Sequence, residues 1–283
     1  MKHFFFRRPF SLAALFLAGG FLFLEAPVLG SAASHLRRPS LSARSAVVVD
    51  AKNGAILYGK NPHLRLPPAS TTKVMTALIA LERLPLNQWV PVSRKAASAE
   101  RSVAGLRAGV SYRVQDLVLA SLVSSSNDAA MALAEAVSGS EEQFVELMNR
   151  RAAELGMTDT HFVNSTGLTD KRRSQYSTAY DLTLLMRRAS GDPRADRMMG
   201  ILTHVIRGSD GKPIALRSHN KMLWRVPCFV KGKTGWTFAS RHTFVGTNYS
   251  TNKKIAFAML SSQQPWIDIQ RLATFGLMLK NSR

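Results

Sequence analysis

The stretch "LPPASTTKVMTALIALERL", residues 66–84, places a serine and a lysine at the start of a strongly apolar run. Two prolines end at Pro68, and from Val74 onward apolar side chains occupy almost every face of a predicted helix. A helix that is apolar all round is expected to be buried. Burying Lys73 in its first turn costs free energy unless the amine is paired or gives up its proton. The stretch therefore predicts a core helix that carries a perturbed lysine one turn from Ser70.

This S-x-x-K pair predicts a nucleophile and its base. Side chains three residues apart on a helix lie on one face, within reach of each other. A serine hydroxyl is a weak nucleophile until a neighbour removes its proton, and a lysine can do so only when it is neutral. Burial lowers the pKa of a lysine toward that state. Three further S-x-x-K matches lie in polar turns or before a short apolar stretch, so we interpret Ser70 and Lys73 as the functional pair; the others begin at Ser209, Ser218 and Ser250.

Two further motifs follow along the chain. Ser125 and Asn127 form an S-x-N triplet inside "SSSND", a run that interrupts two helical patterns and could also be a simple helix cap. Lys233, Thr234 and Gly235 form a K-T-G triplet. A glycine that enters a strand lets a ligand backbone approach the sheet edge closely, although the triplet could also be an ordinary basic strand start.

Strand patterns occur at both ends of the chain. "AVVVDAKNGAILYGK" (46–60) contains two apolar runs around Asn53-Gly54, the strongest short hairpin signal. "HTFVGTNYS" (242–250) and "KKIAFAML" (253–260) predict two more strands joined through Thr251-Asn252. Helices are expected from Ser70, in two runs within 114–137, at 141–155, at 178–190 and at 267–280. We therefore expect an α+β fold: a single domain in which one antiparallel sheet of N- and C-terminal strands packs against an inserted helical region.

The N-terminus has the features of an export signal. Lys2, Arg7 and Arg8 precede a predominantly apolar run 15 residues long, Phe10–Leu24, and small residues follow up to Ala33. The run is shorter than the roughly 20 residues of a membrane span, although an uncleaved anchor is the alternative. We expect a signal peptide at 1–33, a linker at 34–43 and a catalytic domain at 44–283. The protein is then exported to the bacterial periplasm or to the outer face of the cytoplasmic membrane.

Composition limits the partners and cofactors. The 283 residues carry a net charge of +20, which predicts attraction to anionic membrane surfaces or wall polymers. The basic residues are scattered without interleaved aromatic residues, so we expect no nucleic-acid binding. The single cysteine, Cys228, excludes an intrachain disulfide and is expected in the core. No metal-ligand spacing and no glycine-rich phosphate loop occur, so neither a metal nor a cofactor is expected.

The order of the three motifs resembles that of the penicillin-recognising serine enzymes. More closely, the chain resembles the low-molecular-mass penicillin-binding proteins, the D-alanyl-D-alanine carboxypeptidases of the serine DD-peptidase family. The resemblance covers residues 46–240 and rests on "PPASTTKVMTALIAL", "DLVLASLVSSSNDAAMALAE", "LGMTDTHFVNSTGL", "STAYDL" and "KTGWT". It implies a DD-peptidase/β-lactamase-like fold, no cofactor, a role in cell-wall remodelling, stem peptides ending in D-Ala-D-Ala as substrates, and β-lactams as inhibitors.

The resemblance also implies roles for the catalytic residues. Ser70 attacks the carbonyl of the penultimate D-alanine to form an acyl-enzyme, and Lys73 is the base that activates it. Ser125 passes a proton toward the leaving amine, and Asn127 holds Lys73 and the substrate amide.

Substrate-binding roles follow in the same way for the strand that contains the K-T-G triplet. Lys233 adds positive potential, Thr234 and Thr237 offer hydroxyls to the terminal carboxylate, and Gly235 permits close approach. The backbone N–H groups of Ser70 and Trp236 form the oxyanion hole.

The chain departs from the family pattern at several positions. Lys231-Gly232 replaces the usual acidic residue and glycine before K-T-G, and Ala239-Ser240 replaces an alanine-glycine pair. Many members have an arginine shortly before the closing helix, whereas this chain has no cation from residue 262 until Arg271, although Arg241 could substitute. A weaker carboxylate clamp would favour the alternative activity, a DD-endopeptidase that cleaves D-alanyl cross-links.

Two other functions fit less well. A β-lactamase needs a glutamate that activates the deacylating water, as in Glu-x-x-Leu-Asn. Here Glu146 precedes Asn149 by only three residues, within a predicted helix, and "HFVNSTGLTD" contains no glutamate. A catalytically inactive wall-binding protein would have no need of a buried Ser-Lys pair.

Overall fold

The computed structural model describes residues 37–170, 172–224, 230–250 and 253–281. The expected signal peptide at 1–33, Cys228 and the expected turn at 251–252 lie outside the described residues. Among the helices that the structure describes, none has both the length and the apolar character that crossing a bilayer requires.

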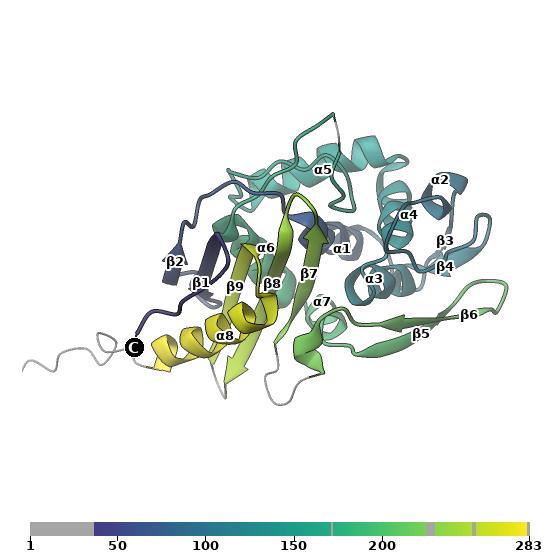
Figure 1. Cartoon of the computed structure of the whole chain (residues 1–283). Coiled ribbons are helices and arrows are strands. Elements are labelled where there is room, and N and C mark those ends of the chain that lie inside the picture. The colour runs from purple at the N-terminus through teal and green to yellow at the C-terminus, as the bar shows by residue number, and fades with distance from the viewer. Residues whose placement is uncertain (1–36, 171, 225–229, 251–252, 282–283) are drawn as a thin grey trace, which may run out of the picture.

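A five-stranded antiparallel sheet forms the centre of the fold, with strand order β2-β1-β9-β8-β7 (Figure 1). N- and C-terminal strands are adjacent, as predicted, because β1 pairs with β9 in a register that places Val48 opposite Phe257. The hairpin at Asn53-Gly54 is also confirmed: Gly54 has φ +81°, which glycine adopts without a steric cost. The strands are β1 (Ser45–Asp50), β2 (Ile56–Lys60), β7 (Lys231–Thr237), β8 (Arg241–Ser250) and β9 (Lys253–Ser262).

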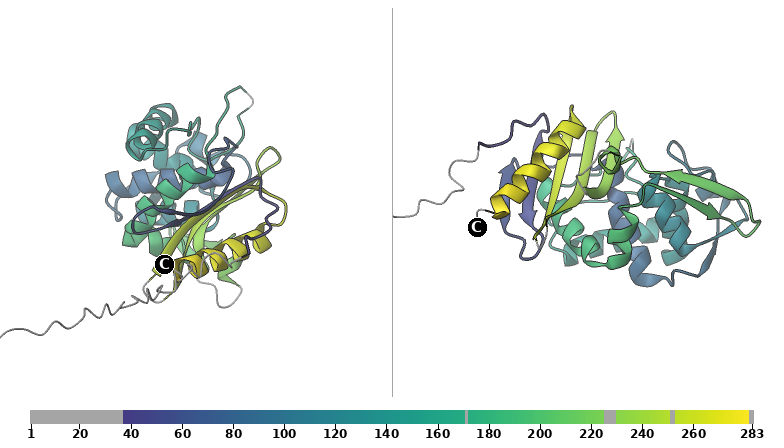
Figure 2. Two further views of the ribbon diagram at one scale, coloured as in Figure 1. Left: turned by 90° about the vertical axis from the view of Figure 1, so that its left-hand side faces the viewer. Right: turned by 90° about the horizontal axis from the view of Figure 1, so that it is seen from below.

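Helices cover both faces of this sheet (Figure 2). On one face, α8 packs against β8 and β9 over a cluster that includes Phe257, Ile269 and Leu272. On the other face lies the helical region, whose larger core contains the buried side of α1. The helices are α1 (Lys73–Arg83), α2 (Arg94–Ala97), α3 (Val114–Val123), α4 (Asn127–Ser138), α5 (Glu141–Glu154), α6 (Ala179–Gly191), α7 (Pro193–Met198) and α8 (Pro265–Asn281).

Three details differ from the predicted elements. The helix expected from Ser70 begins with a 3-10 turn, η2 (Ala69–Thr72), before α1 starts at Lys73. Two small two-stranded sheets were not predicted, because each strand is short and buries few side chains; in the second, Ile206 and Leu216 are the buried residues. These strands are β3 (Trp89–Pro91), β4 (Ser111–Arg113), β5 (Thr203–Arg207) and β6 (Pro213–Arg217), and a 3-10 turn, η3 (Lys221–Leu223), follows.

The end of the segment expected as a linker, 34–43, packs against the domain. Leu41 and Ala43 are buried in the cluster beneath α8. The buried carboxylate of Asp268, in the first turn of α8, accepts hydrogen bonds from the backbone N–H groups of Ser42 (3.1 Å) and Ala43 (2.9 Å) and from Ser42 Oγ (2.6 Å). These contacts attach residues 41–43 to the closing helix.

Candidate active site

Ser70 lies in the η2 turn, held between strand β7 and the loop at 164–168. Two glycines allow this close approach. A Cβ atom on Gly167, which has φ +83°, would overlap the carbonyl oxygen of Ala69. A Cβ atom on Gly235 would lie 2.8 Å from the backbone nitrogen of Ser70. The glycine of the K-T-G triplet thus brings β7 directly against the candidate nucleophile.

Lys73 is fully buried and reaches Ser70. Its Nζ donates hydrogen bonds to Ser70 Oγ at 3.0 Å and to the carbonyl oxygen of Thr166 at 2.6 Å. Burial and, to a smaller degree, the charge of Lys233 lower the pKa of Lys73 well below its ordinary value, although Asp128 opposes this. A lysine whose pKa is lowered in this way has a neutral amine at lower pH, and a neutral amine can accept the proton of Ser70.

The loop at 164–168 is fixed by a residue that the sequence did not single out. Ser165 donates hydrogen bonds from its backbone nitrogen (3.0 Å) and its hydroxyl (2.6 Å) to Glu141 Oε1 at the start of α5. The carbonyl oxygen of Ser165 accepts from Thr76 Oγ1 at 2.6 Å, one turn beyond Lys73 on α1. Because Thr166 follows directly, Glu141 and Thr76 together position the carbonyl group that holds the amine of Lys73.

Ser125 and Lys233 form a second hydroxyl-amine pair. Lys233 Nζ donates to Ser125 Oγ at 2.9 Å and to the carbonyl oxygen of Thr234 at 2.7 Å. Burial lowers the pKa of Lys233 to about 7. Ser125 has φ +61°, a conformation that costs a non-glycine residue about 1–3 kcal/mol and is often found at functional sites. The loop between α3 and α4 therefore holds this hydroxyl in one defined place.

Asn127 begins α4 beside this pair, but it makes no hydrogen bond with Lys73. Its Nδ2 atom donates to the carbonyl oxygen of Glu100 at 2.7 Å, and its backbone nitrogen donates to the carbonyl oxygen of Ser102 at 2.7 Å. Its side-chain oxygen is buried and has no hydrogen-bond partner among the described residues. A buried acceptor without a partner is costly, so this oxygen is available for a donor on a ligand.

Strand β7 presents Trp236 and Thr237 beside the 3-10 turn. The hydroxyl of Thr237, a candidate substrate-binding group, lies 2.9 Å from Ser240 Oγ. Ser240 stands where the family pattern has a glycine, so this departure adds a polar contact to Thr237. Trp236 is 44% exposed and contacts Phe238, which is 73% exposed. A pocket of about 320 Å³ lies next to them; its described lining is Glu100, Arg101, Leu168, Thr169, Trp236, Thr237, Phe238 and Ala239.

The unusual Lys231 before the K-T-G triplet has a partner of its own. Its Nζ donates to Asp196 of α7 at 2.6 Å, and Asp196 also accepts from Tyr249 and from Lys254. Burial opposes ionisation of Asp196, but the hydrogen bonds from Lys231 and Tyr249 and the charge of Lys254 hold its pKa below the usual range. The acidic group thus sits on a neighbouring helix instead of on β7.

The structure separates the two cations considered for the carboxylate clamp. Arg271 Nη1 donates to the carbonyl oxygen of Ser40 at 2.6 Å, so its guanidinium contacts the N-terminal segment next to α8. Arg241 starts β8 and pairs in register with Thr237 at the end of β7. Arg241 is therefore the candidate that lies beside the substrate-binding strand.

Neither Glu146 nor Asn149 is arranged as in a β-lactamase. Glu146 is on the exposed side of α5, 3.8 Å from Arg150. Asn149 is occupied by the backbone of Phe162, to which it both donates (2.9 Å) and accepts (2.8 Å) hydrogen bonds. Within the described residues, no three His, Cys, Asp or Glu side chains gather as a metal-binding group would.

Comparisons with known proteins identify the family of this chain. The family described as D-alanyl-D-alanine carboxypeptidase matches residues 32–264. The chain is 34% identical over 222 residues to the D-alanyl-D-alanine carboxypeptidase DacB2 of Mycobacterium tuberculosis, which covers 78% of this chain and 76% of that protein. It is 31% identical over 252 residues to a D-alanyl-D-alanine endopeptidase of Escherichia coli, which covers 87% of this chain and 80% of that protein.

Solved structures give the same result for the fold. A penicillin-binding protein homologue from Mycobacterium tuberculosis superposes with a TM-score of 0.81 and 32% identity, covering 86% of this chain and 94% of that one. The Streptomyces K15 DD-transpeptidase superposes with a TM-score of 0.79 over 86% of this chain and 100% of that one; its 23% identity supports the fold alone.

A mixed fold with an open antiparallel sheet, and at its edge a serine hydrogen-bonded to a buried lysine, defines the class of penicillin-binding serine DD-peptidases. Within that class, the chain belongs to the D-alanyl-D-alanine carboxypeptidase family.

Proposed function

We propose that this enzyme is a serine-type DD-carboxypeptidase that removes the terminal D-alanine from peptidoglycan stem peptides and is acylated by β-lactams. The observation that carries the proposal is the fully buried amine of Lys73, hydrogen-bonded to Ser70 Oγ at 3.0 Å. The lowered pKa of Lys73 supports the role of a general base, because it favours the neutral amine.

Acylation then uses the first hydroxyl-amine pair. Lys73 accepts the proton of Ser70, and Ser70 Oγ attacks the carbonyl carbon of the penultimate D-alanine. The backbone N–H groups of Ser70 and Trp236 stabilise the oxyanion, a contribution of about 10²–10³ in rate for each donor. The approach of Gly235 to the backbone nitrogen of Ser70 supports this pairing of strand and turn.

Departure of the leaving group uses the second pair. Ser125 passes a proton to the amine of the departing D-alanine, and its contact with Lys233 keeps the hydroxyl oriented. The charge of Lys233 and the hydroxyls of Thr234 and Thr237 hold the terminal carboxylate. The unpaired oxygen of Asn127 accepts the N–H of the substrate amide. Water then hydrolyses the ester on Ser70 and releases the shortened peptide.

Cross-link cleavage by the same acyl-enzyme is the second candidate function. It is favoured by the E. coli endopeptidase relative, of which the chain covers 80%, and by the occupation of Arg271 at the N-terminal segment. A weak carboxylate clamp would reduce the binding of a substrate less when an amide replaces the terminal carboxylate.

The proposed site of action is outside the cytoplasm. Residues 1–33 serve as a signal peptide that exports the enzyme to the periplasm or to the outer face of the cytoplasmic membrane. The net charge of +20 supports peripheral contact with anionic lipids or wall polymers.

The proposal is tested by incubating the protein with a monomeric pentapeptide muropeptide and identifying the products by mass. Release of one D-alanine by the wild type, and none by Ser70→Ala, is the expected result. Intact pentapeptide after prolonged incubation with folded wild-type protein would contradict the proposal.

A further inference from the structure

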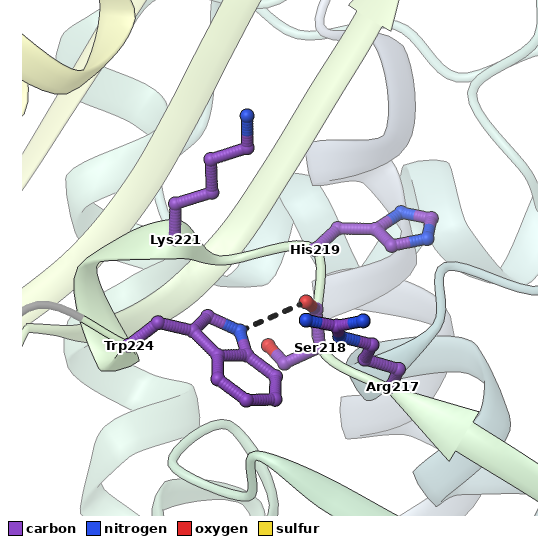
Figure 3. A pocket seen from close by; sticks show the side chains of 5 residues that line it. All are labelled: Arg217, Ser218, His219, Lys221 and Trp224. Atoms are coloured by element: carbon purple, nitrogen blue, oxygen red, sulfur yellow. Dashed lines mark hydrogen bonds between the residues drawn. The ribbon is translucent and has the colours of Figure 1, made fainter.

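A second pocket, separate from the one beside Trp236, is lined by residues between the end of β6 and the residue that follows η3. It has a volume of about 640 Å³, and its described lining is Arg217, Ser218, His219, Lys221 and Trp224, which we call the Arg217–Trp224 pocket. In Figure 3, Trp224 and Arg217 lie along its lower side, and Lys221 and His219 lie above them. This volume is within the range of sites that hold drug-sized ligands.

The Arg217–Trp224 pocket is positively charged and has an aromatic wall. The guanidinium of Arg217 lies 4.5 Å from the centroid of the Trp224 ring, whose indole N–H donates to the carbonyl oxygen of Ser218. The ammonium of Lys221 lies 5.7 Å from the ring of Trp266. Among the described residues, neither Arg217 nor Lys221 forms an ion pair with a carboxylate. Two exposed cations that lack acidic partners are suited to bind carboxylates of a ligand.

Two backbone contacts attach this pocket to the second hydroxyl-amine pair. The backbone nitrogen of His219 donates to the carbonyl oxygen of Val123, two residues before Ser125. Asn220, next in the chain, donates from Nδ2 to the carbonyl oxygen of Val230, three residues before Lys233. Burial lowers the pKa of His219, and the charges of Lys233 and Lys73 lower it further. This effect is consistent with the proximity of His219 to both lysines. The pocket therefore lies on the Ser125 side of the nucleophile.

This position matters because Ser125 is the group that protonates the leaving amine under the proposed function, on which this inference rests. A carboxypeptidase releases a single D-alanine, which needs no pocket of 640 Å³ beyond the carboxylate clamp. A cross-linked substrate releases a whole second stem peptide, attached through its side-chain amine and carrying free carboxylates. The leaving side is where such a peptide must be held.

We propose that, in the cross-link cleavage named above as the second candidate function, the Arg217–Trp224 pocket binds the carboxylate-bearing acceptor peptide of the cross-linked muropeptide. The reaction is hydrolysis. The amide C–N bond between the donor D-alanine and the acceptor amine breaks as Ser70 Oγ forms an ester, and the amine leaves with one proton from Ser125. Water then cleaves the ester and restores the serine. Arg217 and Lys221 are specificity residues here, because they contact the acceptor peptide and not the reacting atoms.

The test compares two substrates in three proteins. Arg217→Ala/Lys221→Ala removes the pocket charges, and Lys52→Ala/Lys212→Ala removes two exposed charges in the β1–β2 and β5–β6 turns as a matched control. For a purified cross-linked dimer, we expect the KM of the pocket variant to rise by about tenfold or more, the loss expected for charged hydrogen bonds, with kcat nearly unchanged. D-Alanine release from the monomeric pentapeptide should stay within about twofold in all three proteins.

Several results would overturn the pocket assignment. An unchanged KM for the dimer, or an equal loss on dimer and monomer, would show that the pocket does not select the acceptor peptide. Wild-type protein that releases D-alanine but leaves the dimer intact would also refute it, while leaving the proposed carboxypeptidase function in place. Failure of both reactions and of penicillin acylation would instead refute the proposed function.

Penicillin acylation also reports folding, because the drug lacks an acceptor peptide. Should the double variant lose acylation, Lys221→Ala and Arg217→Gln each remove one of the two charges and provide the same comparison with smaller changes. An equal KM for the dimer in these single variants and in the wild type would then count against the proposal.

Discussion

The amine of Lys73 and the carbonyl oxygen of Thr166 are 2.6 Å apart, although 93 residues separate them in the chain. This contact fixes the direction of the amine toward Ser70. It serves both protonation states of Lys73, because a carbonyl oxygen accepts a hydrogen bond from a neutral amine as well as from an ammonium. The amine of the proposed base is thus held from the side by a loop and not only by its own helix. Stabilising that loop is then part of the proposed catalytic arrangement.

Removing the loop's anchor should therefore slow acylation. Glu141→Ala deletes the acceptor of both hydrogen bonds from Ser165, and we expect the rate of acylation by a fluorescent penicillin to fall about tenfold, since displacing a positioned group costs of this order or more. Glu141→Gln keeps an acceptor oxygen and should recover most of the rate. Glu142→Ala is the matched control, because Glu142 is exposed and pairs only with Lys95 among the described residues. Equal rates for Glu141→Ala and the control would show that Glu141 does not position Lys73.

The two buried lysines predict a bell-shaped pH profile. Acylation should rise with pH as Lys73 loses its proton, at a pH well below the ordinary lysine value of 10.5. It should fall as Lys233, with a pKa of about 7, loses the charge that attracts the substrate carboxylate. Burial lowers the pKa of Lys73, and the charge of Lys233 lowers it further, so the two limbs of the profile are coupled.

A variant separates the two limbs of this profile. Lys233→Gln removes the positive charge near Lys73, so the rising limb should move to higher pH and the falling limb should disappear. The measurement is kcat/KM for a D-Ala-D-Ala peptide across pH 5–10, as a wide range around neutrality. A rising limb that stays in place in Lys233→Gln would contradict the coupling between the lysines.

Gly235 should tolerate no side chain. Gly235→Ala places a Cβ atom 2.8 Å from the backbone nitrogen of Ser70, one of the two proposed oxyanion donors. We expect acylation to fall by about 10²-fold or more. Gly191→Ala is the control, because a Cβ atom there meets nothing within 4 Å. Acylation of Gly235→Ala at the rate of this control would mean that β7 does not need to approach Ser70 so closely.

The acyl-enzyme formed with penicillin should be long-lived. Glu146 is exposed on α5, and Glu141 is occupied by Ser165, so neither is arranged to activate a deacylating water. We expect hydrolysis of bound penicillin on a timescale of minutes or longer, measured by recovery of free enzyme, and Glu146→Gln should leave it unchanged. Rapid turnover of penicillin would reveal a water-activating base elsewhere.

The sequence predicted the parts of the fold that depend on local patterns. The turn at Asn53-Gly54 and the apolar stretches of β8 and β9 are local patterns, and the strand pairing follows from burying both ends of the chain in one sheet. The helix at Lys73 follows from its continuous apolar run. The sheets β3–β4 and β5–β6 were missed because their strands are mostly exposed and lack a hydrophobic face that stands out in the sequence.

The structure brings the predicted motif residues of the candidate site together, but the sequence did not predict the contacts that hold them. Glu141 and Ser165 are 24 residues apart, and nothing in the local sequence of either indicates the other. Likewise, Lys231 departed from the family pattern in the sequence, and only the fold shows that Asp196 on α7 supplies the opposite charge. The run "NSTGL" indicates a turn, because Asn, Ser, Thr and Gly favour turns. It does not identify the carbonyl group of Thr166 as the partner of Lys73.

The most direct test of the account is the location of the covalent adduct. The protein is acylated with a labelled penicillin, digested, and the modified peptide is identified by mass spectrometry. The adduct is expected on Ser70, because it is the serine hydrogen-bonded to the buried amine of Lys73, and Ser70→Ala should carry no label. An adduct on Ser125 or on any other serine, or a label that persists in folded Ser70→Ala protein, would contradict the account.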